Sequence, residues 1–299
     1  MIKSARNAAA SAMAWTIYHA PALEAPYAHA AHAARRVPGL HTLFRETTDR
    51  LTVRLVNGRR QCRRVRIGSV EPLFDVTSFT VKGQYFAHVP YEPGATDALL
   101  RFLEPGGVFV DVGANAGYFT IVAALRVGPT GRVFAFEPNP RVREQLRRHV
   151  EINSVDDRVT IVDVALANRN DDEGTLFVSC WPENDGISSL TPSAETIARG
   201  GLRSDATIAV RVRRFDTWAA AEKLTDIDLM KIDVEGAEAQ VLEGMARTLE
   251  RGSPRRIICE TMPSSDAVEM LHARRYCSSI VDEIPGGIPN LLFESAGAP

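Results

Sequence analysis

The sequence has few cysteines, and none of them are paired at metal-binding spacing. The 299-residue chain contains Cys62, Cys180, Cys259 and Cys277, which lie far apart and form no Cys-x-x-Cys motif. This spacing gives no indication of a zinc site or of a dense disulfide framework. Scattered cysteines are typical of a reducing compartment, so we expect a cytoplasmic protein.

The chain also lacks a strong charge of either sign. It has 35 Lys and Arg residues against 37 Asp and Glu residues, a formal net charge of −2. This balance provides no overall attraction to nucleic acid or to an anionic membrane, and we expect neither as a partner. One local basic group fits either a solvated sheet face or a site for an anionic substrate: Arg59, Arg60, Arg63, Arg64 and Arg66.

No hydrophobic run near the start is long enough to cross a bilayer, so we expect no membrane span. The stretch Ala8–Tyr18 follows two basic residues and superficially resembles a signal peptide, which remains an alternative. It is rich in alanine, the best helix former, while Pro21 and Pro26 should break a helix. We therefore predict a helical lead-in over residues 1–40.

Two kinds of pattern divide the chain near residue 98. Residues 51–67 alternate apolar and polar side chains around Asn57-Gly58, which predicts a β-hairpin. With the segment Phe74–Val89 they indicate a small β-rich region, so residues 1–98 are predicted as a helical and β-rich extension. From residue 99 to residue 299, strands alternate with amphipathic helices, which predicts a mostly parallel, doubly wound α/β sheet with helices on both faces.

The elements of this second region can be placed individually. The predicted strands are Val108–Val112, Val133–Glu137, Val159–Val164, Ile227–Asp233 and Ile257–Glu260. The predicted helices are Tyr118–Val127, Arg141–Ile152 and Ala237–Leu249. An insert over residues 174–213 carries the strand-like segments Thr175–Val178 and Thr207–Val212.

A glycine-rich turn follows the first predicted strand. Gly113, Ala114, Asn115 and Gly117 come after the strand-end residue Asp111 and directly precede a helix. Such a turn admits a ligand close to the backbone and presents helix N-terminal amides. A dinucleotide site favours G-x-G-x-x-G, but here Asn115 and Tyr118 occupy the second and third glycine positions, which argues against NAD. S-adenosylmethionine fits better, because Asn115 can bond its amino-acid portion and Asp111 can organise the turn or meet its ammonium.

The next two strand ends extend the predicted donor site. Glu137, followed by Pro138, stands where an acid can accept hydrogen bonds from both ribose hydroxyls. The alternative is that Glu137 only caps the helix that begins near Pro140. Asp163 and Val164, at the end of the third strand, are predicted to lie beside the adenine.

Several motifs occur in the order found in the FkbM family of S-adenosylmethionine-dependent methyltransferases. They are Phe109–Asn115 with Gly117 and Thr120, Phe136–Pro140, Ile187–Leu190, Phe215–Asp216, Lys231–Glu238 and Asn290–Phe293. At the fourth motif, Arg214 and Phe215 stand where the family usually has threonine and leucine. The stretch from Gly107 to Phe293 therefore resembles this family, whereas residues 1–98 are not explained by it.

The resemblance implies a Rossmann-like, class I methyltransferase sheet and methyl transfer, mostly to oxygen atoms of polyketides, sugars and other secondary metabolites. It adds Thr120 to the predicted donor site. Ser188 and Ser189 match a serine pair common in the family's insert. We predict that this insert covers the acceptor pocket and that the two serines bind the acceptor. We leave the identity of the acceptor and the oligomeric state open.

Lys231, Asp233 and Glu235 are the predicted catalytic residues. Ligands of open α/β sheets bind beyond the carboxyl ends of the strands, and alternation places these three side chains on one side if the strand stays extended. One carboxylate would serve as general base, with Lys231 tuning its charge. Two alternatives stay open: a structural ion pair of Lys231 with a carboxylate, and a divalent metal held by these carboxylates plus Glu260.

The predicted function is therefore methyl transfer from S-adenosylmethionine to a hydroxyl oxygen of a small molecule. An N-methyltransferase or RNA methyltransferase is one alternative, although the acidic net charge counts against RNA. A non-catalytic or NAD-type nucleotide-binding domain is the other, and the mismatches at Asn115 and Tyr118 count against it.

Overall fold

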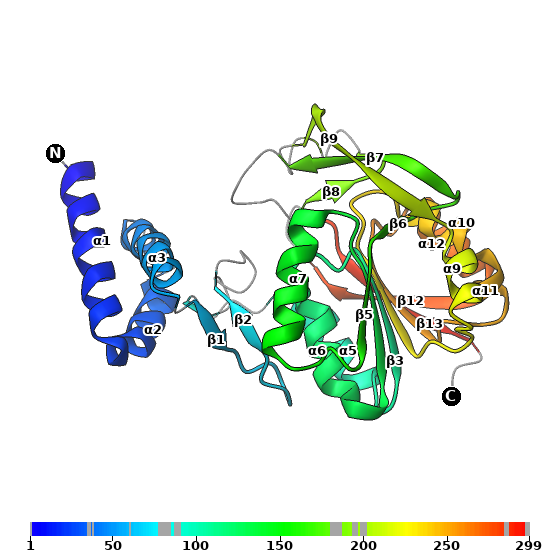
Figure 1. Ribbon diagram of the computed structural model, residues 1–299, viewed down its shortest axis with the longest axis horizontal. Coiled ribbons are helices and arrows are strands. Elements are labelled where there is room, and N and C mark those ends of the chain that lie inside the picture. The colour runs from blue at the N-terminus through cyan, green and yellow to red at the C-terminus, as the bar shows by residue number, and fades with distance from the viewer. Residues whose placement is uncertain are drawn as a thin grey trace. The chain divides into compact units, whose positions relative to one another are not determined.

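The computed structural model describes residues 2–34, 37, 39–59, 61–76, 85–86, 91–179, 187–192, 197, 202–283 and 287–296. The chain divides into two compact units, which Figure 1 shows in blue to cyan and in green to red. The first unit comprises Met1–Arg66 and Leu73–Tyr91, and the second comprises Ile67–Pro72 and Glu92–Pro299. Helix α5 (Pro93–Phe102) belongs to the second unit and runs across position 98, where we placed the boundary. No described helix combines the length and the hydropathy that a membrane span requires.

The first unit begins with the predicted helical lead-in. Helix α1 (Ile2–His19) is followed by the 3₁₀ turn η1 (Pro21–Leu23) and by helix α2 (Glu24–Ala34). Pro21 lies two residues beyond the end of α1, as expected of a residue that cannot continue a helix. The expected break at Pro26 is wrong, because Pro26 lies in the first turn of α2, where a backbone N–H has no partner within the helix.

The predicted hairpin around Asn57 and Gly58 is also wrong. The segment forms the end of helix α3 (Leu40–Asn57), and Gly58 donates its backbone N–H to the carbonyl of Arg54. Leu51 and Leu55 are fully buried, and their spacing of four residues places them on one face of a helix. The Asn-Gly pair therefore ends a helix here, with Gly58 at φ −88°.

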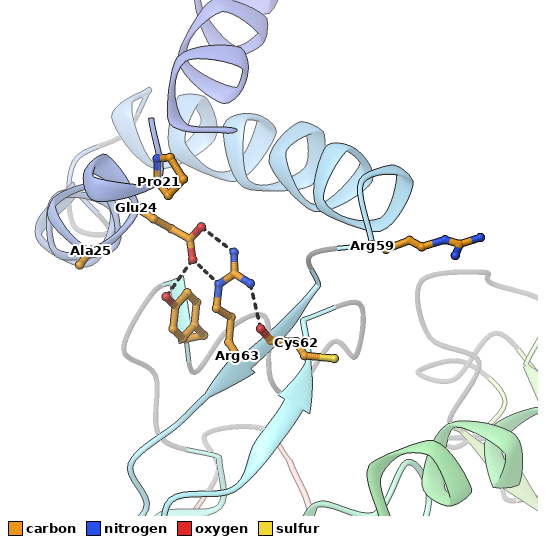
Figure 2. Close-up of a pocket in the computed structure, with 7 residues that line it drawn as sticks. Pro21, Glu24, Ala25, Arg59, Cys62 and Arg63 are labelled. Carbon is orange, nitrogen blue, oxygen red and sulfur yellow. Dashed lines mark hydrogen bonds and ion pairs between the residues drawn. The ribbon is translucent and has the colours of Figure 1, made fainter. Parts of the chain in front are cut away.

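The described β structure of this unit is one short antiparallel pair, β1 (Cys62–Arg64) with β2 (Leu73–Asp75). Beside it lies a cavity of about 430 Å³, lined by Pro21, Glu24, Ala25, Arg59, Cys62, Arg63 and Tyr85. Figure 2 shows Arg63 and Glu24 pointing toward one another, and the guanidinium donates to both carboxylate oxygens. Arg63 is thus paired within the fold. Arg64 and Arg66 are exposed, and Arg60 lies outside the described residues.

A seven-stranded sheet forms the centre of the second unit (Figure 1). Its order is β12 (Tyr276–Asp282), β13 (Asn290–Ser295), β11 (Arg256–Glu260), β10 (Leu229–Ile232), β3 (Val108–Val112), β4 (Arg132–Phe136) and β5 (Val159–Val162). Strand β13 is antiparallel to both neighbours, and the other pairs are parallel. The predicted Rossmann-like, mostly parallel sheet is confirmed. The strand order reverses between β3 and β10, the position where such sheets bind ligands.

Helices cover both faces of this sheet. In Figure 1, α5, α6 (Tyr118–Val127) and α7 (Pro140–Ile152) lie on one side. On the other side lie α9 (Phe215–Ala221), α10 (Glu238–Gly244), α11 (Ala246–Glu250) and α12 (Asp266–Ala273). The predicted single helix Ala237–Leu249 is wrong in one respect, because Met245, with φ −116°, separates α10 from α11. The strands of the centre are buried between these layers, which explains their continuous apolar runs.

A smaller sheet follows β5 and contains the insert. Its strand order is β6 (Val164–Leu166), β9 (Leu202–Arg213), β7 (Asp171–Ser179) and β8 (Ser188–Ser189). The predicted strand Val159–Val164 therefore ends two residues early, because Val164 already belongs to this second sheet. The two strand-like segments of the insert are parts of β7 and β9. Residues 180–186, 193–196 and 198–201 lie outside the described residues.

Candidate active site

The turn after β3 has the backbone conformation that its glycines allow. Gly113 and Gly117 have φ values of 84° and 92°, in the left-handed region that favours glycine. A Cβ atom at Gly113 would lie 1.8 Å from the backbone oxygen of Asp233. Gly113 thus allows close contact between the loops that follow β3 and β10. This contact brings the predicted donor turn and the predicted catalytic loop together.

Hydrogen bonds hold this turn in place. The backbone N–H groups of Gly113 and Ala114 donate to the carbonyl of Phe136, at 3.1 Å and 2.9 Å. Below the turn, the Thr120 hydroxyl donates to Asp111 at 2.6 Å, and burial raises the pKa of Asp111 to about 6. Of the two roles open to Asp111, these contacts support organisation of the turn. Thr120, predicted as part of the donor site, takes part through its hydrogen bond to Asp111.

Glu137 lies at the end of β4, buried beside the turn. Its two carboxylate oxygens accept from the backbone N–H groups of Asn115 at 2.9 Å and Asn139 at 2.8 Å. Burial raises its pKa to about 7, although these two bonds favour the ionised form. The alternative role as a cap of α7 is not supported, because the Asn139 side chain caps that helix by accepting from Arg141 N–H at 3.1 Å. Pro138 is half-buried between the two.

Asp163 and Val164 lie apart from these contacts. The Asp163 side chain is exposed and pairs with Arg211 of β9. Val164 is buried at the start of β6. Their placement beside the adenine therefore stays a prediction.

Lys231 is a buried cation at the end of β10. Its side chain is 1% exposed, and Nζ lies 3.3 Å from Asp233 Oδ2 and 3.4 Å from Glu92 Oε2. Nζ also lies 5.2 Å from the centroid of the Phe119 ring, within cation–π range. Burial opposes the charged ammonium, but the carboxylates of Asp233, Glu92 and Glu260 raise the pKa of Lys231 above its usual value. Lys231 is therefore charged at every physiological pH.

Three carboxylates, each at least half-buried, lie around this ammonium. Glu92, Asp233 and Glu260 each offer one oxygen atom, and the three atoms lie within 4.8 Å of one another. Burial, and then the charge of Asp233, raise the pKa of Glu260 to about 10. By spacing alone, the three oxygens could hold a metal ion. Since Nζ of Lys231 already contacts two of them, the group contains a cation of its own.

Glu235 does not join this group. Strand β10 ends at Ile232, and Glu235 has a φ of 55°, so the extended conformation assumed in the sequence analysis does not persist. The Glu235 carbonyl accepts a hydrogen bond from the Ser189 hydroxyl at 2.8 Å. Ser188 accepts from the Asn139 side chain at 3.3 Å. The two serines thus attach the insert to the loops that follow β10 and β4.

Sequence reasoning missed Glu92. It lies immediately before α5, far in sequence from the predicted catalytic residues, and belongs to no motif that we identified. Glu260 was considered only as a metal ligand, although it is the last residue of the strand next to β10. The position of Glu260 followed from the parallel sheet, whereas no sequence signal indicated Glu92.

Comparison with known proteins gives a family match over the centre of this chain. The model of the FkbM methyltransferase domain matches residues 111–279. The chain is 30% identical over 154 residues to the 2-O-methyltransferase NoeI of Sinorhizobium fredii, covering 50% of this chain and 61% of the relative. It is 31% identical over 164 residues to the 31-O-demethyl-FK506 methyltransferase FkbM of Streptomyces tacrolimicus, covering 48% and 61%. The chain spans about three fifths of the length of these two curated relatives.

Solved structures resemble this chain only distantly. An O-methyltransferase from Bacillus cereus, in complex with SAH, has a TM-score of 0.44 and 15% sequence identity. The match covers 73% of this chain and 89% of that chain.

Proposed function

The chain belongs to the FkbM methyltransferase domain family, and on that premise we propose that it transfers a methyl group from S-adenosylmethionine to a hydroxyl oxygen of a small molecule. The names of the two relatives support oxygen as the acceptor atom. One observation carries the proposal: the Gly113 turn approaches the backbone of Asp233 so closely that a Cβ atom would overlap it. A carboxylate loop therefore adjoins the predicted donor turn.

The residues around the turn fit the methyl donor. Each oxygen of Glu137 accepts one backbone N–H, and a carboxylate oxygen has acceptor capacity for a second donor such as a ribose hydroxyl. Asn115 and the amides at the start of α6 suit the carboxylate of an amino acid. When bound, S-adenosylmethionine supplies a methyl group activated by positively charged sulfur.

The chain's own contribution to the reaction is positioning and proton removal. Alignment of the acceptor oxygen with the methyl carbon can lower the barrier by roughly 7–11 kcal/mol. An alcohol becomes a good nucleophile only as its proton leaves, and a general base typically contributes about 10²–10⁴-fold. We assign this base to Asp233 rather than Glu235, because Asp233 contacts the charged Lys231.

The test is methyl transfer with the whole chain. Purified protein is incubated with radiolabelled S-adenosylmethionine and a panel of hydroxylated sugars and polyketides, with an RNA sample as a separate arm. We expect label in at least one hydroxylated acceptor and none in RNA. Heat-denatured protein serves as the control that separates enzymatic from spontaneous transfer. Binding of NAD without binding of S-adenosylhomocysteine would contradict the proposal at its base.

A further inference from the structure

Glu92 has an unusual backbone conformation for its residue type. Its φ and ψ are 38° and 65°, in the left-handed region that a residue with a Cβ atom rarely adopts. Such conformations persist where the surrounding structure enforces them, and they are concentrated at functional sites. The conformation of Glu92 therefore needs both a structural cause and a reason to be retained.

The cause lies in the contacts of two residues in the first turn of α5. The backbone N–H groups of Gly94 and Ala95, at the start of α5, both donate to the carboxylate of Asp282 at 2.7 Å. A Cβ atom at Gly94 would lie 1.8 Å from the carbonyl oxygen of Val281. The start of α5 is thus held tightly against β12. Asp282 satisfies the helix amides that an acidic residue at the position of Glu92 would otherwise cap.

The Glu92 side chain is directed to Lys231 instead. It is 7% exposed, and its Oε2 lies 3.4 Å from Lys231 Nζ. The same oxygen accepts from the Asn290 side chain at 2.9 Å. Asn290 is fully buried in β13, opposite Glu260 of β11. Glu92 precedes the family-matched segment 111–279 and Asn290 follows it. Residues outside that segment therefore form part of the environment of Lys231.

Stability alone does not explain three carboxylates around one ammonium. A buried lysine needs one close carboxylate for charge balance, and Asp233 already provides it. Each further buried carboxylate costs several kcal/mol of desolvation unless it is compensated. Protonation of Glu260 relieves part of this excess, since burial raises the pKa of Glu260 to about 10. Glu92 then remains as a second carboxylate in contact with Lys231, held there by a strained backbone.

We propose that Glu92 is a positioning residue for the methyl transfer proposed above: it holds the Lys231 ammonium beside Asp233, so that Asp233 is the carboxylate that takes the acceptor's proton. The inference rests on that proposed function. In the step itself the acceptor O–H bond breaks, and the proton passes to Asp233. The oxygen's electron pair forms the new O–CH₃ bond, while the electrons of the S–CH₃ bond stay on sulfur. Glu92 touches neither reacting atom.

The chain makes the position of Lys231 measurable without an acceptor. Its sequence contains only four lysines, Lys3, Lys82, Lys223 and Lys231. With ¹⁵N-labelled lysine, NMR should show one ammonium signal protected from solvent exchange, and Lys231→Arg assigns it. In Glu92→Gln we expect this signal to move or to disappear through faster exchange. The matched control is Asp97→Asn, which removes an exposed carboxylate from the same helix, α5.

Kinetics with an acceptor identified as above provide the second readout. Glu92→Gln should lower kcat about tenfold, while the KM of each substrate and the affinity for S-adenosylhomocysteine stay within twofold. Glu92→Asp retains the charge and should recover part of the rate that Glu92→Gln loses. If Glu92→Gln fails to fold, Glu92→Asp serves as the second variant. An unchanged kcat, or an unchanged Lys231 signal, in a folded Glu92→Gln variant would overturn the proposal.

Failure of the proposed function has a different signature. A wild-type chain that neither binds S-adenosylhomocysteine nor methylates any acceptor would contradict methyl transfer itself. The Lys231 signal in Glu92→Gln would still decide whether Glu92 holds the ammonium.

Discussion

Two parts of the candidate active site are constructed in different ways. The donor side, defined as Asp111–Gly117 with Glu137, comes from adjacent strands β3 and β4 and is held mainly by backbone hydrogen bonds. The proton side, defined as Glu92, Lys231, Asp233 and Glu260, joins three separate stretches of chain through side-chain charges. Backbone geometry therefore determines one side, and the balance of buried charge determines the other.

This difference separates the effects that substitutions should have. On the donor side, a change of backbone shape should disturb folding and cofactor binding together. On the proton side, removal of a charge should alter turnover and leave cofactor binding in place. The two sides touch where Gly113 meets the backbone of Asp233.

The largest effect is expected where the two sides meet. Gly113→Ala introduces a Cβ atom into a left-handed conformation and into the Asp233 backbone, at a combined cost of roughly 2–5 kcal/mol. Thermal and denaturant unfolding should show this loss of stability. Gly106→Ala is the control, since Gly106 has a φ of 83° but its nearest neighbouring atom would lie 3.4 Å from the Cβ. Equal losses in both variants would rule out the close approach as the cause.

The next effect concerns the donor side alone. Glu137→Ala removes the carboxylate proposed to bond the ribose, and should weaken S-adenosylhomocysteine binding by roughly 1.5–3 kcal/mol, or about 10- to 150-fold. Calorimetry measures this change directly. Glu144→Ala, which removes an exposed carboxylate from α7, should bind like the wild type. Wild-type affinity in Glu137→Ala would place the ribose elsewhere.

Asp233→Asn tests the proton side with little change of shape. It removes the charge that accepts the proton, so turnover should fall at least tenfold, about 1.4 kcal/mol in the barrier. Glu235→Gln is the matched control and should retain most activity, since Glu235 lies outside the carboxylate group. Full activity in both variants would leave a mechanism of positioning alone, without a base on this loop.

The pH dependence of binding gives a further distinction. The pKa of Glu137 is raised to about 7, so the carboxyl gains a proton below that pH and loses acceptor capacity for hydroxyl donors. S-adenosylhomocysteine should therefore bind more tightly as the pH rises from about 6 to 8, by at most tenfold per pH unit. Calorimetry across this range should show the trend in wild type and not in Glu137→Gln. A flat wild-type profile would contradict the role of the Glu137 charge.

The smallest effect is expected at the insert. Ser189→Ala removes the hydrogen bond to the Glu235 carbonyl, worth about 1 kcal/mol, and should raise the acceptor KM a few-fold with donor affinity unchanged. Ser188→Ala should have less effect, because its contact with Asn139 is longer, at 3.3 Å. A larger change in donor affinity than in acceptor KM would contradict a role of the insert on the acceptor side.

The sequence predicted the backbone of the donor side better than the side-chain contacts of the proton side, for a physical reason. Glycines at required left-handed positions and an acid at a strand end are local signals, so Gly113, Gly117 and Glu137 could be placed from their neighbours. Glu92 could not, because its contact with Lys231 depends on Asp282, which anchors the start of α5 from the other end of the chain.

Local sequence patterns that occur in more than one kind of structure led to wrong predictions. An Asn-Gly pair can form a hairpin turn between two strands or stand at the end of a helix. Asn57-Gly58 stands at the end of a helix here, one face of which buries Leu51 and Leu55. Alternation at Lys231, Asp233 and Glu235 predicted one shared side, but the strand ends before Asp233. In both cases tertiary packing, rather than the local pattern, determined the outcome.

The most direct test compares a donor-side variant and a proton-side variant in one experiment. Calorimetric titration with S-adenosylhomocysteine is performed on wild type, Glu137→Ala and Asp233→Asn under identical conditions. We expect binding by wild type, at least tenfold weaker binding by Glu137→Ala, and binding within threefold of wild type by Asp233→Asn. Absence of binding by wild type, or equal weakening in the two variants, would contradict the division of this site into a donor side and a proton side.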